Sequence, residues 1–132
     1  MPTLERLVYE STATGSTQSL LNMATILGEA QRNNDRQDLT GALAAHRERF
    51  IQVLEGSPER LDALLRRLES DPRHKHLRII DRAPVEHRMF AGWSMAHARL
   101  TPELENQLDE VMMIAEPSGD RLAELLKQAT TH

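Results

Sequence analysis

The chain has 132 residues, the size of one domain with one hydrophobic core, and its 39% hydrophobic and 27% charged residues are typical of a folded globular protein. Its apolar runs are short and its N-terminus lacks a basic stretch followed by an apolar one. We therefore expect a cytoplasmic protein without a membrane span or a secretory signal. The absence of cysteine excludes disulfides and thiolate chemistry, and the net charge of −4, with interleaved signs, argues against a nucleic-acid surface.

The first part of the chain predicts one strand and one helix. Residues 4–10 alternate between apolar and polar side chains, which is typical of a strand. Apolar residues then recur at helical spacing, and we expect this helix to begin after a cap at Ser16 or Thr17 and to end near Asn33.

The middle of the chain predicts a hairpin followed by a helix. Residues 39–46 and 49–55 have strand patterns and are separated by a tight turn. Ser57-Pro58 is a strong helix start, with a hydroxyl at the N-cap and proline in the first turn, and Asp71-Pro72 ends that helix.

Two further strands and two helices complete the prediction. The strands are expected over residues 77–85 and 92–98, and the helices over 101–115 and 118–129, with a break at Pro117-Ser118-Gly119. The resulting order is that of an α+β fold, a ferredoxin-like βαββαββ sandwich with two C-terminal helices.

The third strand is apolar on both faces, because Phe50 and Leu54 share one face while Ile51 and Val53 share the other. The two internal helices can cover only one face of the sheet. The other face needs the C-terminal helices or a partner subunit as its cover.

Gln52 and Tyr9 are polar groups on faces that are expected to be buried. Gln52 lies between Phe50 and Leu54, and Tyr9 shares a face with Leu7. A buried amide without partners costs about 1–3 kcal/mol for each unmet group, so each side chain requires a partner. They either satisfy each other in an ordinary core or contact a ligand.

Two further polar clusters have both a structural and a functional interpretation. Asn33 and Asn34 are either turn residues at a helix end or a pair of amides that contacts the edge of a heterocycle. Asp71, Arg73 and His74 form either a solvated turn or a site for a phosphate or a ring carbonyl. The histidines show no metal-ligand spacing, and no phosphate-binding loop or nucleophile motif is present.

These features resemble, in order and spacing, the BLUF family, which are sensors of blue light using FAD. The segments that carry the resemblance, over roughly residues 3–98, are Leu7-Val8-Tyr9-Glu10-Ser11, Arg32-Asn33-Asn34, Leu39-Thr40-Gly41, Phe50-Ile51-Gln52-Val53-Leu54-Glu55-Gly56, Asp71-Pro72-Arg73-His74 and Arg88-Met89-Phe90-Ala91-Gly92-Trp93-Ser94-Met95. The resemblance implies a photosensor domain over 1–98, with residues 99–132 as its helical cap.

The resemblance also implies a site. The flavin ring would lie between the two internal helices, Tyr9 would donate an electron and a proton to the excited flavin, and the amide of Gln52 would rearrange. Trp93 and Met95, on the last strand, would report the change. The implied flavin-binding residues are Ser11, Asn33, Asn34, Phe50, Gln52, Asp71, Arg73 and His74, and the photoactive ones are Tyr9, Gln52, Trp93 and Met95.

The cofactor implied is FAD, with FMN possible, and no enzymatic activity of the chain itself is expected. The output would pass to a protein partner or a homo-oligomer through the sheet face and the C-terminal helices. Two alternatives stay open at this point, a small phosphohydrolase on the same fold and a flavin-free interaction module.

Overall fold

The computed structural model describes residues 3–15, 20–114 and 116–130. Its strands are β1 (Glu5–Ala13), β2 (Thr40–His46), β3 (Arg49–Gly56), β4 (His74–Pro84) and β5 (Ala96–His97), and its helices are α1 (Leu20–Arg36), α2 (Pro58–Glu69), α3 (Pro102–Met112) and α4 (Gly119–Thr130). None of the helices in this described part is long and apolar enough to cross a membrane.

The five strands form one sheet in the order β4-β1-β3-β2-β5. β1 pairs antiparallel with both β3 and β4, β2 pairs antiparallel with β3, and the short β5 runs parallel to β2. This topology confirms the predicted ferredoxin-like fold with one extra strand.

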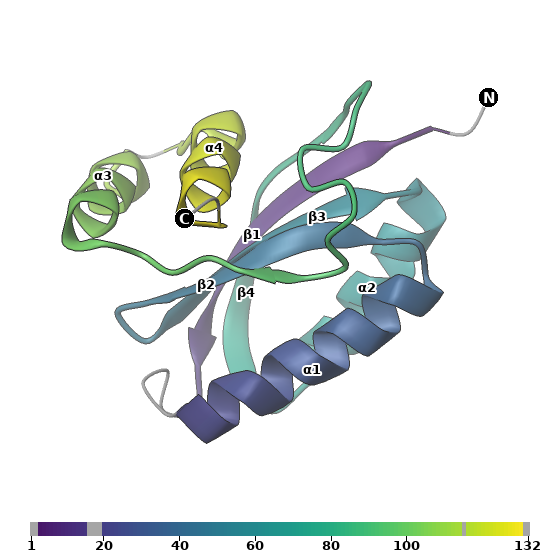
Figure 1. The fold of residues 1–132 in the computed structure, drawn as a ribbon, viewed down its shortest axis with the longest axis horizontal. Coiled ribbons are helices and arrows are strands. Elements are labelled where there is room, and N and C mark those ends of the chain that lie inside the picture. Colours follow the sequence, from purple (N-terminus) through teal and green to yellow (C-terminus); the bar gives the residue numbers. More distant parts are fainter. Residues whose placement is uncertain (1–2, 16–19, 115, 131–132) are drawn as a thin grey trace.

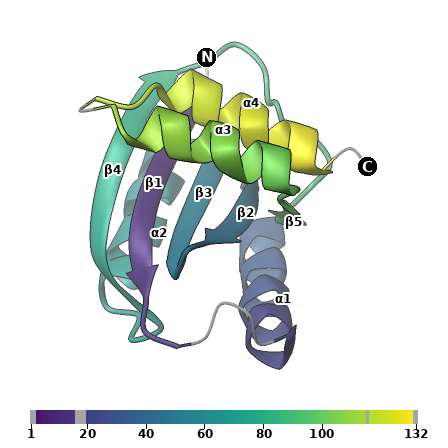
Figure 2. The same cartoon turned by 90° about the vertical axis from the view of Figure 1, so that its left-hand side faces the viewer.

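Each face of the sheet is covered by one pair of helices (Figures 1 and 2). α1 and α2 lie on one face, where Leu7, Leu43 and Leu54 pack with the apolar side of α2. α3 and α4 lie on the other, where Ile51 and Val53 pack with both helices. The third strand is therefore buried on both sides, as its sequence predicts, and the chain's own C-terminal helices provide the second cover.

A two-residue turn sets the register that aligns the central strands. Arg47 and Glu48 both have positive φ, at 50° and 65°, the conformation of the tight turns that join twisted antiparallel strands. The sheet then places Gln52 on β3 directly beside Tyr9 on β1 and Leu43 on β2.

Several predicted boundaries are wrong. α1 continues to Arg36 rather than ending near Asn33, because the closing bonds come one turn later, where the Asn34 carbonyl accepts from the amides of Gln37 and Leu39. β4 begins at His74 instead of residue 77, since the chain pairs with β1 as soon as it leaves the turn after α2.

The predicted helix caps have mixed outcomes. Ser57 occupies the N-cap position of α2, but its side chain makes no capping hydrogen bond there. Thr101 caps α3 by accepting from the amide of Leu104. The cap predicted at Ser16 or Thr17 lies outside the described residues.

Candidate functional site

A cavity of about 470 Å³ lies between α1, α2 and the sheet face that these helices cover. Its volume is within the range of small-molecule sites, and its walls combine apolar and polar side chains. The lining residues are Tyr9, Ile26, Glu29, Ala30, Arg32, Asn33, Asn34, Arg36, Leu43, Phe50, Gln52, Leu64, Arg67, Leu68, Asp71, Arg73 and His74.

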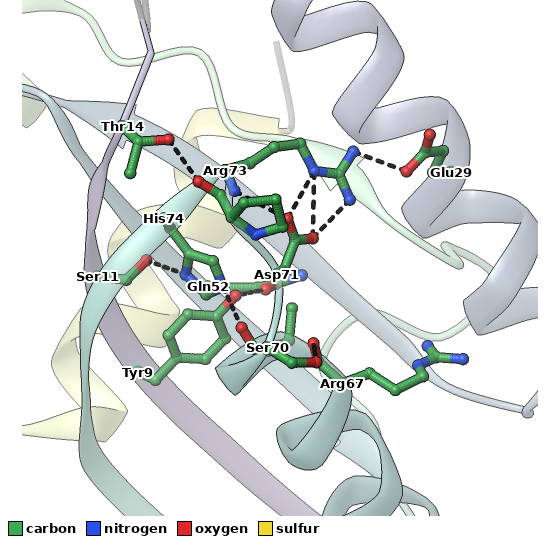
Figure 3. Close-up of polar contacts among 12 residues, drawn as sticks. Tyr9, Ser11, Thr14, Glu29, Gln52, Arg67, Ser70, Asp71, Arg73 and His74 are labelled. Carbon is green, nitrogen blue, oxygen red and sulfur yellow. Dashed lines mark hydrogen bonds and ion pairs between the residues drawn. The ribbon is translucent and has the colours of Figure 1, made fainter.

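Tyr9 and Gln52 meet at the sheet wall of this cavity. The Tyr9 hydroxyl donates to Oε1 of Gln52, as neighbouring positions on β1 and β3 allow (Figure 3). Nε2 of Gln52 donates to the Met95 sulfur at 3.4 Å. The amide thus lies between a hydroxyl and a thioether, and its orientation is set by those two groups.

Burial keeps the Tyr9 hydroxyl protonated. Tyr9 is 3% exposed, and this desolvation, with a smaller contribution from the Asp71 charge, raises the pKa of its hydroxyl well above the ordinary value of tyrosine. Tyr9 therefore remains a hydrogen-bond donor to Gln52 over the whole physiological pH range.

The imidazole of His74 lies beside the Tyr9 ring, with centroids 6.4 Å apart. Nε2 lies 2.6 Å from the Leu68 carbonyl, and Nδ1 lies 2.7 Å from the Ser11 hydroxyl. Because a carbonyl only accepts, Nε2 carries the proton, and in the neutral ring Nδ1 accepts from Ser11. His74 thus lines the cavity beside Tyr9, whereas Ser11 does not line it and contacts the site through the His74 ring.

Arg73 joins the start of β4 to α1 at the cavity rim (Figure 3). Its guanidinium donates to both carboxylate oxygens of Asp71, and Nη1 donates to Glu29 at 2.7 Å. The hydrogen bond from Arg73 is the main cause that lowers the pKa of Asp71 and, reciprocally, raises that of Arg73. Asp71 and Arg73 are therefore a charged pair on the rim.

The two asparagines on α1 each have one amide atom engaged. Oδ1 of Asn33 accepts from Arg67 on α2 at 2.6 Å, whereas Nδ2 of Asn34 donates to the Ser94 carbonyl at 2.8 Å. The groups left by these bonds are complementary, since Asn33 retains its N–H donors and Asn34 retains its carbonyl acceptor. Both residues line the cavity, so one wall can offer a donor and an acceptor to a polar ring edge.

Trp93 and Met95 lie on opposite sides of the sheet. Met95 is buried in the core that includes Tyr9, whereas Trp93 packs on the core below α3 and α4, with Lys127 4.4 Å above its ring. The prediction that both lie on the last strand is wrong, because the chain turns at Gly92 and only Ala96 and His97 pair with β2.

Glu55, near the end of β3, is a structural residue that is not among the predicted site residues. It is completely buried and accepts hydrogen bonds from Arg6, Thr40 and the backbone amides of Met89 and Phe90. Its carboxylate thereby attaches the loop before Trp93 to the sheet. An acid within a strand that is apolar on both faces was the available signal.

Comparison with protein-family models matches residues 4–96 to the BLUF family, described as sensors of blue light using FAD. The match covers more than half of the chain and includes β1 to β4 and the first residue of β5, together with every residue of the cavity wall.

Individual relatives agree with this match. The photoactivated adenylate cyclase subunit beta of Euglena gracilis is 31% identical over 130 residues, which are 98% of this chain and 14% of that protein. The chain therefore spans a small part of the curated relatives it matches.

Solved structures share the fold. The BLUF structure of BlrP1 is 28% identical with a TM-score of 0.72, covering 98% of this chain and 90% of that one. The dark-state structure of BlrB, a BLUF protein, has a TM-score of 0.82 and covers 98% of both chains. At 24% identity it supports the fold alone.

Proposed function

Because this chain belongs to the BLUF family of blue-light sensors, we propose that its flavin binds in the cavity between α1 and α2 and that Tyr9 and Gln52 carry the light-dependent change. The observation that supports this most directly is the hydrogen bond between the Tyr9 hydroxyl and the Gln52 amide in the cavity wall. A bound flavin supplies the absorption of blue light and an excited state that can accept an electron and a proton.

The chemistry of the cavity fits a flat ring with one polar edge. Phe50, Leu43 and Leu64 provide apolar walls, and the two asparagines provide a donor and an acceptor on one side. Such a combination suits a heterocycle whose imide edge alternates carbonyl acceptors with an N–H donor. Ser11, Asp71, Arg73 and His74 complete the proposed flavin-binding residues.

The amide of Gln52 is suited to a two-state switch. Half a turn about its last bond exchanges the carbonyl and the NH₂ group without moving the backbone. In the observed orientation Oε1 faces the Tyr9 donor and Nε2 faces the Met95 sulfur, so both ends of the amide are satisfied. In the reversed orientation Oε1 faces a sulfur that cannot donate. The protein by itself therefore favours the observed orientation, which we assign to the dark state.

We propose that the chain senses light without catalysing a reaction of its own, with residues 1–98 as the sensor and 99–132 as its cap. The output would pass through α3 and α4 to another protein or to a second copy of the chain. The position of Trp93 against Lys127 of α4, two residues from Met95, supports this direction. Among its relatives, the photoactivated adenylate cyclases are named for a light-controlled activity.

The first prediction concerns the cofactor. Gently purified protein supplied with FAD should be yellow, should hold about one non-covalent flavin per chain, and should show a small reversible red shift of the flavin band in blue light. We expect the extracted flavin to co-migrate with FAD rather than FMN in chromatography, as the family's description suggests. A colourless protein would contradict the proposal and favour a flavin-free interaction module or a phosphohydrolase.

A further inference from the structure

The segment Trp93–Met95 has no regular structure, yet each of its three backbone carbonyls accepts a hydrogen bond from another element. The Trp93 carbonyl accepts from the amide of Gly41 at 3.1 Å. The Ser94 carbonyl accepts from Nδ2 of Asn34 at 2.8 Å, and the Met95 carbonyl accepts from Nε2 of Gln31 at 3.0 Å. Two of these three donors are side chains of α1.

Gln31 and Asn34 are one turn apart on α1, so their side chains project from the same side of the helix. The chain bends at Ser94 and Met95, which allows two consecutive carbonyls to reach these amides. Asn34 also lines the flavin cavity, whereas Gln31 lines a separate hollow formed with residues 92–97 and Thr130. Gln31 can therefore be changed without altering the wall of the flavin cavity.

Met95 depends on its backbone for its position beside Gln52. A thioether is a weak acceptor, so the 3.4 Å contact between the Met95 sulfur and Nε2 of Gln52 contributes little to holding the side chain in place. The hydrogen bond from Gln31 is made by the backbone of the same residue. It is thus a direct polar contact that helps to fix the position of Met95.

We propose that Gln31 is a positioning residue of the light switch. It holds the Met95 backbone so that the thioether faces the Gln52 amide, and in this way it stabilises the dark orientation of that amide. This inference rests on the photoreceptor function proposed above. Gln31 contacts neither the flavin cavity nor Gln52 in this arrangement, and it acts only through Met95.

The test compares Gln31→Glu and Gln31→Ala with the parent chain, all loaded with FAD. Both variants remove the donor to Met95, and the first is nearly isosteric. Because one hydrogen bond is lost from the dark arrangement, we expect the red-shifted band to return in the dark about three- to ten-fold more slowly. Amide exchange should be faster over residues 93–97, while flavin content should equal that of the parent.

Gln37→Glu is the matched control, because it makes the same change at an exposed residue in the turn after α1, and it should recover at the parent's rate. Recovery at the parent's rate in both Gln31 variants would overturn the role of Gln31, even if exchange over 93–97 increased. An equal change in Gln37→Glu would also overturn it. A parent chain without any red shift would instead refute the photoreceptor function itself.

Discussion

At the scale of single residues, the proposed light switch depends on one amide whose two ends have different partners. Gln52 is 6% exposed and contacts a strong donor, Tyr9, on one side and a weak acceptor, Met95, on the other. This asymmetry gives the amide a preferred orientation, but the preference rests on few bonds.

The second prediction removes either member of the Tyr9–Gln52 pair. Gln52→Leu should retain flavin but lose the normal red shift, because leucine has no amide to rearrange, and Tyr9→Phe should behave likewise. Tyr9→Phe also leaves a buried carbonyl without its donor, so its free energy of unfolding should fall by about 1–3 kcal/mol. Absorption spectra and urea unfolding measure both effects, with Gln37→Leu as an exposed control. A normal photocycle in either variant of the pair would refute the switch mechanism.

At the scale of secondary-structure elements, a cluster of charged side chains attaches α3 to the β2–β3 hairpin. Asp109 accepts from Nε of Arg47 at both carboxylate oxygens and lies 2.8 Å from Nε2 of His46. Glu105, one turn earlier on α3, lies 3.2 Å from the other ring nitrogen of His46. α3 is thereby attached to the end of β2, and Leu43 of β2 packs in the same core as Tyr9 and Met95.

The third prediction uses this cluster. The Arg47 and His46 contacts lower the pKa of Asp109 to about 2, below the ordinary value of about 3.9. A lowered pKa contributes stability that is present above the unfolded value and is lost as pH falls through the folded one. Asp109→Asn should therefore lower the melting temperature at pH 7, and its difference from the parent should shrink between pH 4 and about pH 2.

Circular dichroism at several pH values measures these melting temperatures. Asp35→Asn, at an exposed carboxylate on α1, removes the same charge and is the matched control. A deficit for Asp109→Asn as large at pH 2 as at pH 7 would contradict the assignment of its stability to the ionised carboxylate.

At the scale of the whole molecule, the sheet separates the proposed flavin cavity from the C-terminal helices. The segment 93–95 is where the two sides meet, because Met95 contacts the switch amide on one face while Trp93 contacts Lys127 on the other. Movement of this segment can therefore change how α4 packs.

The fourth prediction follows from this arrangement. Blue light should change amide exchange more over residues 93–126 than over α2 (Pro58–Glu69), which packs on the cavity side. A coupling of about 1–3 kcal/mol would be enough to change the affinity for a partner several-fold. Exchange measured by mass spectrometry in dark and light tests this. Unchanged exchange over 93–126 would move the proposed output to another segment, such as the turn over 71–73 at the cavity rim.

The order of helices and strands, and one part of the site, could be predicted from the sequence alone. Strand alternation and helical spacing depend on neighbours a few residues apart, so the sheet, the hairpin and the two apolar faces of β3 followed from the pattern. Tyr9 and Gln52 were predicted to be buried polar groups that need partners for the same reason, because each is polar on a face that must be buried.

The partners of the remaining polar side chains, and the faces on which Trp93 and Met95 lie, could be found only from the tertiary structure. Asn33 and Asn34 are adjacent in sequence, yet one accepts from Arg67 and the other donates to the Ser94 carbonyl. Trp93 and Met95 reach opposite faces because the chain bends at Ser94 and Met95 instead of forming a strand there. The partner of a polar side chain depends on which distant segment packs against it. The spacing of residues along the chain does not predict that contact.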